Sequence, residues 1–383
     1  MVALLFRQEN FVNLVYEIAI LCPHSAPVWI RSKLAKVFHY GGAHSGAGVA
    51  AVVWYIMYTA VTTKDYIDHR DSTPALANLI TSYVLVTMFC LILAGAHPTF
   101  RRMHHDYFEA VHRYSGWVAL ATFWTHTIFA ANEYRVLESN PPVSLGRYLI
   151  STPNFWTLCV STSTSILSWG RLRRVDVHSE VLSDHATRLH FKYRNMPPFY
   201  GLKVSSRPLL EWHAFATIPD DNPVTGKSEG FSLVVSNAGD WTNDMIKNPP
   251  TKLWVRGYPL HGLLYTSRLF KKIVVVATGS GIGPCLSLFY ADVTPRRIFW
   301  STANPEVTYG EGILNTVLKA DPDAVIWNTR SQGRPDMVKI TYQLVQEAQA
   351  EAVFIISNPK LTRKVVLGME SRGIPAYGAI FDS

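Results

Sequence analysis

The most constraining stretch of the sequence is residues 273–284, which read Ile-Val-Val-Val-Ala-Thr-Gly-Ser-Gly-Ile-Gly-Pro. The β-branched run at 273–277 is typical of a strand that is buried on both faces of a sheet. Gly279, Gly281 and Gly283 follow, and glycine both turns tightly and lets a phosphate approach the backbone. The pattern predicts a strand, a glycine-rich turn and a helix that bind the pyrophosphate of a dinucleotide. The simpler alternative is a sharp turn between a strand and a helix.

Composition indicates that part of the chain lies in a membrane. The 383 residues are 48% hydrophobic and 17% charged, whereas soluble domains average about 25% charged. Basic loops alternate with loops of mixed charge, as the positive-inside rule requires. The net charge of +8 therefore fits membrane topology and does not require nucleic acid as a partner. Spanning helices are expected within four apolar segments, at about 46–61, 76–96, 115–131 and 148–169.

The pattern divides the chain into four regions. Residues 1–37 form an amphipathic helical segment that suits a membrane surface or, equally, a soluble helix. Its polar residues argue against a signal peptide. Residues 38–174 are predicted to be a transmembrane bundle of about four helices. Residues 175–265 are predicted to be a flavin-binding β-barrel or a sandwich, and residues 266–383 a Rossmann-like nucleotide domain with a parallel, doubly wound sheet.

The predicted fold class is thus multi-domain: an α-helical transmembrane bundle, a β-barrel and an α/β domain. Strands of the barrel are expected at 175–182, 189–193, 212–218, 232–236 and 252–255. Strands of the parallel sheet are expected at 273–277, 297–302, 323–328, 351–357 and 378–381, with helices such as 310–319 and 337–349 between them.

Three histidines lie in or beside the apolar segments. His112 and His126 are fourteen residues apart, nearly four helical turns, so both point to one face of a helix. His44 and His112 lie near the predicted cytosolic side and could hold one haem between two helices. Tyr58 occupies the position opposite His126, so at most one haem is predicted. The alternative is that these histidines hydrogen-bond within the bundle or bind lipid headgroups.

Two stretches of the barrel region offer ligands for a flat ring and for phosphate. His213 and Phe215 lie on an expected strand, where an aromatic side chain can cover a ring and a histidine can reach a phosphate. Taken alone, this stretch is an ordinary strand. Arg256 and Gly257 offer a cation and free backbone amides for a second phosphate.

The order of these features resembles that of a known group of membrane flavoproteins. Membrane helices with histidines, a flavin barrel and a Gly-x-Gly-x-x-Pro nucleotide domain are similar to the ferric reductase/NADPH oxidase superfamily over residues 38–383. Four short segments resemble the fungal TmpA-type integral membrane flavoproteins in particular. They begin at His44, Ala238, Trp300 and Gly378.

The resemblance implies FAD and NADPH as cofactors. Phe215 would stack on the isoalloxazine and His213 would approach the pyrophosphate, with Thr217, Arg256 and Gly257 completing the flavin site. The nicotinamide nucleotide would be held by Thr278, Gly279, Ser280, Gly281, Gly283 and Pro284. Ser357 and Asn358 would lie near the nicotinamide, and Phe381 near the flavin ring.

The resemblance also implies a site for the adenosine 2′-phosphate at Arg330, Ser331 and Arg334, because guanidinium groups suit a dianion. The alternative is that Arg330 pairs with Asp336. Two positions depart from the family pattern: Ala216 replaces a hydroxyl residue expected beside flavin N5, and Ser357 replaces a cysteine.

These observations predict an integral membrane flavoprotein oxidoreductase with its flavin and nucleotide domains in the cytosol. It would pass a hydride from NADPH to FAD, and then electrons to a membrane-side acceptor or small-molecule substrate that the sequence does not name. These two departures, together with the missing histidine partner of His126, favour the alternative of a flavin-bearing sensor or signalling protein with little turnover. A third interpretation is a membrane scaffold without a cofactor. Membrane lipid and NADPH are the expected partners, and nucleic acid is not.

Overall fold

The computed structural model describes residues 1–68, 73–138, 141–221 and 228–379. The chain forms two compact units. The helical unit comprises Met1–Gln8, Gly41–Gly170 and Arg207–Glu211, and the sheet unit comprises Glu9–Tyr40, Arg171–Ser206 and Trp212–Ser383. Each unit is considered by itself below.

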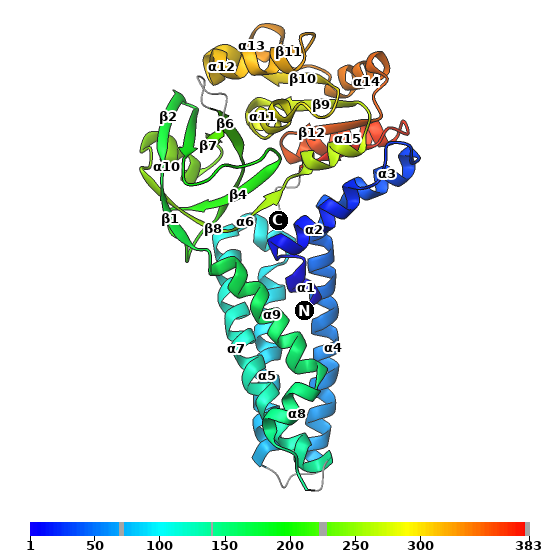
Figure 1. Cartoon of the computed structure of the whole chain (residues 1–383), viewed down its shortest axis with the longest axis vertical. Helices are drawn as coiled ribbons and strands as arrows, with labels where there is room; N and C mark the ends of the chain where they lie inside the picture. The colour runs from blue at the N-terminus through cyan, green and yellow to red at the C-terminus, as the bar shows by residue number, and fades with distance from the viewer. Residues whose placement is uncertain (69–72, 139–140, 222–227, 380–383) are drawn as a thin grey trace. The chain divides into compact units, whose positions relative to one another are not determined.

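Four long helices make up most of the helical unit: α4 (Tyr40–Asp68), α5 (Thr73–Gly95), α7 (His105–Glu138) and α9 (Pro153–Trp169). They run beside one another (Figure 1), together with the short helices α1 (Val2–Leu5), α6 (Pro98–Met103) and α8 (Leu145–Ser151). Proline in the first turn of α6 and α9 favours helix initiation there. All four predicted apolar segments are thus helical. Two helical stretches, Val28–Asp68 and Ala75–Gly95, are long and apolar enough to cross a bilayer by length and composition.

Two antiparallel sheets of four strands each form the first part of the sheet unit, in the orders β1-β8-β4-β5 and β2-β3-β7-β6. Their buried side chains, such as Leu189, Val204, Leu233 and Val255, form one apolar core, the arrangement of a sandwich. Helix α10 (Asp240–Lys247) follows β7. The strands are β1 (Arg173–Asp176), β2 (His178–Ser183), β3 (Ala186–Phe191), β4 (Tyr200–Ser205), β5 (His213–Ala216), β6 (Ile218–Asp221), β7 (Ser228–Ser236) and β8 (Lys252–His261).

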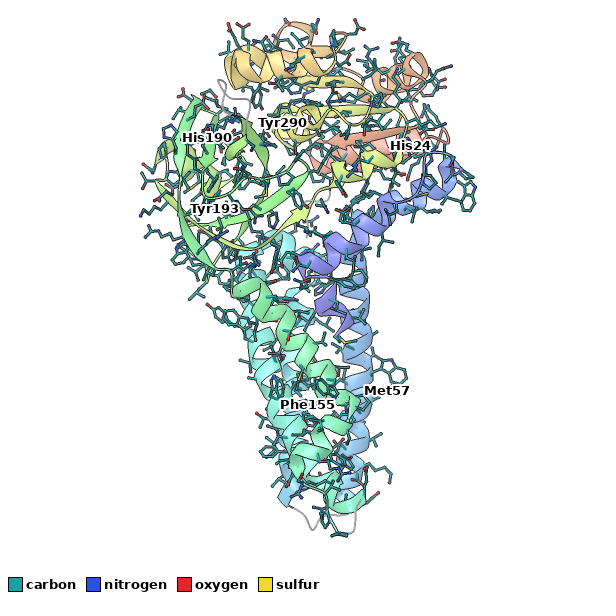
Figure 2. The ribbon with its side chains drawn as sticks, viewed as in Figure 1. His24, Met57, Phe155, His190, Tyr193 and Tyr290 are labelled. Atoms are coloured by element: carbon teal, nitrogen blue, oxygen red, sulfur yellow. The ribbon has the colours of Figure 1, made fainter. Side chains whose placement is uncertain are left out.

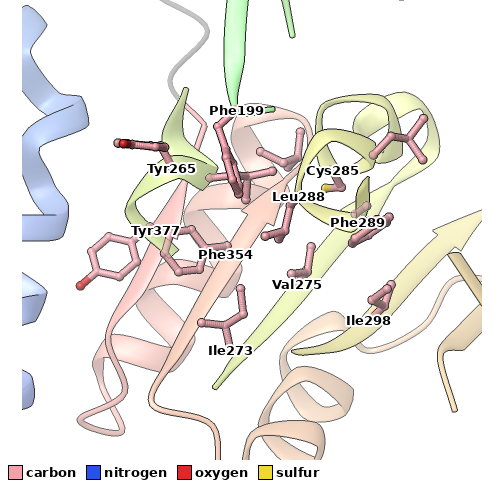
Figure 3. Packing of buried hydrophobic residues seen from close by; sticks show 14 of the residues in the cluster. Phe199, Tyr265, Ile273, Val275, Cys285, Leu288, Phe289, Ile298, Phe354 and Tyr377 are labelled. Atoms are coloured by element: carbon pink, nitrogen blue, oxygen red, sulfur yellow. The ribbon is translucent and has the colours of Figure 1, made fainter. Parts of the chain in front are cut away.

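A five-stranded parallel sheet forms the second part, in the order β11-β10-β9-β12-β13. This order is doubly wound and changes direction between β9 and β12, so the predicted sheet is confirmed. The strands are β9 (Ile273–Thr278), β10 (Arg296–Thr302), β11 (Val325–Asn328), β12 (Ala352–Ile356) and β13 (Ala376–Gly378). The main connecting helices are α11 (Ile282–Ala291), α12 (Pro305–Ala320), α14 (Met337–Ala348) and α15 (Pro359–Glu370). Figure 3 shows the apolar packing around β9, with Val275, Leu288 and Phe354 among its members.

Two N-terminal helices, α2 (Glu9–Ile20) and α3 (Val28–Ala35), are part of the sheet unit. Val12 and Tyr16 are buried in the core that surrounds β9. Arg31 donates to both carboxylate oxygens of Glu351, at 2.7 and 2.9 Å, and to the Leu269 carbonyl at 2.8 Å. The compact units divide this part of the chain near residues 8 and 40, and the boundary at residue 37 stays a prediction. Helix α2 buries Val12, Tyr16 and Ala19, whereas Leu14 and Ile18 of the predicted apolar stripe are exposed. The buried side packs against residues more than 200 positions away, which no local pattern reveals.

Candidate functional site

The glycine-rich turn lies at the carboxyl end of β9, as the 3-10 turn η3 (Gly279–Gly281). Gly279 has a φ of +50°, in the left-handed region that favours glycine. A Cβ on Gly281 would lie 2.1 Å from the Ile356 carbonyl oxygen at the end of β12, so the neighbouring strand leaves no room for a side chain. Helix α11 begins directly afterwards at Ile282, and the N-terminus of a helix favours an anion. The predicted strand–turn–helix unit is therefore present.

Two buried aromatic residues hold this turn, and the sequence did not identify them as part of the site. The Trp300 indole N–H donates to the Gly279 carbonyl at 3.0 Å. The Tyr309 hydroxyl lies 3.6 Å from the point that a Gly279 Cβ would occupy. Their rings contact each other, with centroids 5.4 Å apart. Trp300 lies within the strand predicted at 297–302 and begins one of the segments that carry the family resemblance, and these were the available signals.

Two predicted hydroxyl residues meet where the strand order reverses. The Thr278 and Ser357 hydroxyl oxygens are 2.5 Å apart, the first at the end of β9 and the second just after β12. Ligands of doubly wound sheets bind in the crevice at this point. Asn358 has a structural task, because its side-chain oxygen accepts from the Leu361 N–H at 3.0 Å and caps α15. Phe381 lies outside the described residues.

The three residues predicted to read a 2′-phosphate follow β11. Arg330, Ser331 and Arg334 are all exposed. The Asn328 side-chain oxygen accepts from the Arg330 N–H at 3.0 Å and from the Asn304 N–H at 3.1 Å. These bonds fix the turn α13 (Thr329–Gln332) to the end of β10. Asn304, which sequence reasoning missed, has a φ of +42° just before the first turn of α12.

Asp336 does not compete for Arg330. One oxygen of its carboxylate accepts from the N–H groups of Val338 and Lys339, each at 3.1 Å, and so caps α14. Within the described part of the chain, no ion pair to Arg330 is formed. The expected alternative, an Arg330–Asp336 pair, is therefore not what the structure shows. The guanidinium is open to an anionic ligand.

The flavin candidates lie on β5 and β8 of the same antiparallel sheet, but their side chains point to opposite faces of that sheet. Phe215 stands opposite Leu202, and His213 opposite Val204, so both share the face that carries the buried core. Arg256 stands opposite Lys203, which stands opposite Ala214, so these three share the other face. The Arg256 guanidinium lies 4.6 Å above the Trp212 ring. The structure thus brings His213 and Phe215 together and separates them from Arg256.

An aromatic residue that the sequence did not single out lies against the flavin candidates. The Trp241 ring stacks on His213, with centroids 4.0 Å apart, and lies 5.9 Å from the Phe215 ring. Its indole N–H donates to the Ser206 hydroxyl at 3.0 Å. In the sequence, Trp241 could have been found only through the short run 238–242, which is one of the segments that carry the family resemblance.

Two further flavin candidates have other tasks. The Thr217 hydroxyl donates to the Tyr200 carbonyl at 2.9 Å, and Thr217 is fully buried. Gly257 has a φ of +70°, and a Cβ there would lie 2.5 Å from a carboxylate oxygen of Glu9. Helix α2 therefore covers this glycine, and its backbone does not face an open phosphate site. Both outcomes depend on contacts between distant segments.

The helical unit brings its predicted residues together in two pairs. The ring centroids of His44 and His112 are 6.0 Å apart. His44 Nδ1 is 2.7 Å from the Ala3 carbonyl oxygen, which leaves Nε2 as the nitrogen for another ligand. The Tyr58 hydroxyl is 3.2 Å from His126 Nε2, so Tyr58 faces His126 as predicted. In the chain as described, no group of three or more His, Cys, Asp or Glu side chains could hold a metal ion.

A doubly wound parallel sheet with a glycine turn at its switch point is an architecture that dinucleotide-binding α/β domains share. Residues 263–383 match the family described as adenylate-forming reductase 03009, C-terminal domain. The whole chain is 46% identical over 382 residues to adenylate-forming reductase 03009 of Coprinopsis cinerea, and 44% identical over 384 residues to adenylate-forming reductase 06235 of the same fungus. The chain spans 36% of the length of each of these curated relatives.

Solved structures share part of this architecture at low similarity. A ferredoxin NADP+ reductase from Neisseria gonorrhoeae with bound FAD and NADP gives a TM-score of 0.43 at 13% identity, over 55% of this chain and 98% of that chain. The ferredoxin reductase in carbazole 1,9a-dioxygenase gives 0.41 at 14% identity, over 55% and 70% of the two chains. The fold assignment therefore follows from the strand order and register given above.

Proposed function

We propose that the sheet unit is an NADPH-dependent flavin reductase module. The observation that carries the proposal is the switch point at the carboxyl ends of β9 and β12, where the glycine turn and the Thr278–Ser357 hydroxyl pair meet. The name of the two relatives, adenylate-forming reductase, supports a reduction. Bound NADPH would supply a hydride there, and bound FAD would accept it.

The residues at this switch point suit the binding of the phosphates of a dinucleotide. Gly279 turns the chain at the end of β9, and Gly281 lets it pass close to Ile356. The Trp300 indole N–H holds the Gly279 carbonyl, so the turn is fixed before any ligand arrives. A preformed backbone cradle lowers the entropy cost of binding. The exposed guanidinium of Arg330, with Ser331 and Arg334 nearby, would hold the 2′-phosphate that distinguishes NADPH from NADH.

The flavin would lie against β5, with Phe215 as its aromatic support and Trp241 at the neighbouring edge. Arg256 and Lys203 would supply positive charge on the other face of the sheet. The proposal thus assigns Phe215 to the flavin ring and Arg256 to the phosphates. Their separation predicts that Phe215 and Arg256 contribute independently to FAD affinity.

Two observations favour a second candidate, a flavin sensor with little turnover. Ala216 carries no hydroxyl, and the Thr217 hydroxyl is committed to the Tyr200 carbonyl. Neither residue then offers a hydroxyl beside flavin N5. Steady-state turnover that is much slower than flavin reduction by NADPH would support the sensor, and comparable rates would support the enzyme.

The helical unit completes the proposal as a membrane anchor of the ferric reductase and TmpA type, with the sheet unit in the cytosol. The two long apolar helical stretches support it. At most one haem would be held, by His44 and His112, whose rings lie 6.0 Å apart. A pyridine haemochrome assay of the purified chain tests this part. One haem per chain that is lost in His112→Ala would support it, and two haems would contradict it.

The flavin reductase proposal is tested on the full chain purified in mild detergent. FAD content is measured by absorbance after protein precipitation, and flavin reduction is followed anaerobically with NADPH. Phe215→Ala should lower FAD affinity about fivefold, because an aromatic contact contributes roughly 1 kcal/mol beyond burial. Phe100→Ala, at a partly exposed position on α6, is the matched control and should leave FAD affinity unchanged. Protein that neither carries nor takes up FAD would rule out the flavin module.

A further inference from the structure

Residues 207–211 form the loop between β4 and β5, yet they belong to the helical unit and not to the sheets that they connect. The Leu209 carbonyl accepts from the Arg113 guanidinium at 2.5 Å and from the Tyr114 hydroxyl at 3.3 Å, and both donors lie on α7. The first of these bonds joins residues 96 positions apart. The loop is therefore fixed beside one particular turn of α7.

The composition of α7 changes at this turn. Residues 105–113 include two acids and end with Arg113, whereas residues 114–132 contain no Asp, Glu, Lys or Arg. Helix α9 changes in the same way at its other end, because residues 148–170 carry none of these charges and Arg171 follows. Such a change is expected where a helix passes between water and lipid.

Aromatic side chains gather at this level of the two helices. The Trp117 ring lies 5.5 Å from the Tyr114 ring and 5.3 Å from the Trp169 ring of α9, measured between centroids. Tyr114 and Trp117 are 42% and 38% exposed, so both reach the outside of the helical unit. Tyrosine and tryptophan concentrate where a bilayer meets water, because each has an apolar ring and one polar group. These three residues, the aromatic belt, therefore mark the headgroup level of a bilayer.

The loop itself presents an apolar tip. The N–H groups of Leu210 and Glu211 both donate to the Arg207 carbonyl, at 2.9 and 3.1 Å, so the chain turns tightly. Leu209 and Leu210 are 52% and 48% exposed in this turn. Two adjacent exposed leucines leave apolar surface in water, and covering that surface with an apolar partner is favourable.

The charged groups beside the tip are paired within the unit. Arg207 Nε lies 3.3 Å from Glu211 Oε1, across the base of the turn. Arg113 donates to Glu109 at 2.9 Å, as well as to the loop. Attraction between these arginines and anionic lipids is therefore not required, and a zwitterionic bilayer should suffice.

We propose that this loop inserts Leu209 and Leu210 into the boundary between the headgroups and the acyl chains of a bilayer. The partner is a lipid surface because the loop is bonded to the turn where α7 loses its charges, at the level of the aromatic belt. The inference rests on the proposed membrane anchor. It adds that the connection directly before β5, the strand of the flavin candidates, is itself held in the membrane.

The experiment maps lipid contacts on the full chain, reconstituted in phosphatidylcholine vesicles. A small share of the lipid carries a diazirine near the carboxyl end of one acyl chain, and labelled peptides are quantified by mass spectrometry after illumination. The peptide with Leu209 and Leu210 should be labelled at least tenfold more than the peptide with Leu367, which is 58% exposed on α15 of the sheet unit. The peptide with Leu91, 45% exposed on α5, reports whether the helical unit lies in the bilayer. This comparison within one chain does not depend on any variant being folded.

A double variant, Leu209→Ser with Leu210→Ser, tests the role of the two side chains. Carbenes insert into O–H bonds as readily as into C–H bonds, so a loop that stayed in the lipid would keep its label. The label on the loop should instead fall at least fivefold, because serine does not favour the apolar boundary. Leu367→Ser is the matched control and should leave the label on the loop unchanged. Gel filtration and circular dichroism confirm that each variant is folded.

Three outcomes would overturn the proposal. Equal labelling of the loop and of Leu367, in a chain whose α5 is labelled, would show that water or another protein covers the leucines, while the membrane anchor stands. A chain without label on either the loop or α5 would refute the anchor as well. Label on the loop that requires added phosphatidylserine and disappears in 1 M salt would show binding through charge and not by insertion, because salt at this concentration screens exposed charges beyond about 3 Å.

Discussion

Several buried hydroxyls of the helical unit and two long-range polar contacts of the sheet unit show two different ways of satisfying polar groups. In the helical unit, hydroxyls such as those of Thr59, Ser161 and Thr164 donate to carbonyls three or four residues earlier in their own helix, at 2.7–2.9 Å. In the sheet unit, Arg31 bonds to Glu351, and the Tyr377 hydroxyl donates to the Ser32 carbonyl at 3.0 Å. The second kind of bond joins residues more than 300 positions apart.

The difference shows which unit depends on its assembled tertiary structure. A helix whose hydroxyls bond locally keeps those bonds whatever surrounds it, as a lipid environment demands. A long-range bond exists only when distant segments are held together. Substitution of a hydroxyl residue that bonds only within its own helix should therefore cost little in the helical unit, whereas substitution of Arg31 or Tyr377 should cost stability in the sheet unit. The predictions below test this contrast.

The largest effect is expected for Arg31→Ala. The Arg31 side chain is 2% exposed and its partner Glu351 18%, and removing one partner of a buried ion pair costs about 3 kcal/mol or more. The free energy of opening is measured by hydrogen exchange of peptides that cover β9 and β12 in the full chain. Lys36→Ala breaks an ion pair of 3.7 Å between half-exposed side chains and should cost less than about 1 kcal/mol. Equal costs for both would refute the contrast between buried and surface pairs.

The second-largest effect is expected on the choice between NADPH and NADH. It tests an exposed residue that follows β11, at the edge of the parallel sheet. Arg330→Ala should weaken NADPH binding about ten- to a hundredfold, because a hydrogen bond to a charged group contributes roughly 1.5–3 kcal/mol. NADH lacks the phosphate and should bind equally to both proteins. Flavin reduction at graded concentrations of each coenzyme measures this. Parallel losses for NADH and NADPH would mean that Arg330 does not read the phosphate.

A smaller, pH-dependent effect is expected on the antiparallel sheets. The Asp220 carboxylate, 2.6 Å from Nδ1, raises the pKa of His190 above its ordinary 6.5, although burial opposes this; Glu180 also raises the pKa and Arg188 lowers it. His190 lies on β3, in the β2-β3-β7-β6 sheet (Figure 2).

A raised folded-state pKa stabilises the fold below pH 6.5, and that stability is lost as the pH rises through the folded-state value. Hydrogen-exchange protection of β3 and β7 should therefore fall between pH 6 and pH 9. The fall should amount to at most about 1 kcal/mol, since the pair is partly exposed. His190→Gln should remove this dependence. A variant with the same pH profile as the wild type would assign the effect to another group.

Sequence patterns predicted those features that local periodicity determines. The runs at β9, β10 and β12 are apolar because both faces of each strand are buried, and their order followed from alternation with helices. Helical spacing alone placed Tyr58 opposite His126. The glycine turn was predictable because only glycine allows the close approach to Ile356.

Features that depend on distant contacts were not predictable. Strand β4 was missed because Gly201 and Lys203 interrupt its apolar pattern. The separation of Phe215 and Arg256 follows from strand register, which a single sequence does not specify. The contact of Trp241 on α10 with His213 on β5 joins elements that are separated in the sequence by β6 and β7.

The smallest effect is expected for Thr164→Val, and it tests the contrast from the helical side. Thr164 is 7% exposed, yet its hydroxyl donates only to the Ser161 carbonyl at 2.7 Å within α9. Valine keeps the shape of the side chain, and the Ser161 carbonyl keeps its backbone hydrogen bond within the helix, so the cost should stay below about 0.5 kcal/mol.

Tyr377→Phe also removes one buried hydroxyl, but this hydroxyl ties β13 to α3, and its loss leaves the Ser32 carbonyl without that donor. The cost there should be about 1–2 kcal/mol. Hydrogen exchange of α9 peptides for the first variant and of β13 peptides for the second gives both values in the same full chain. If Thr164→Val costs as much as Tyr377→Phe, the local bond in α9 also supports packing between helices, and the helical unit is as dependent on its tertiary structure as the sheet unit.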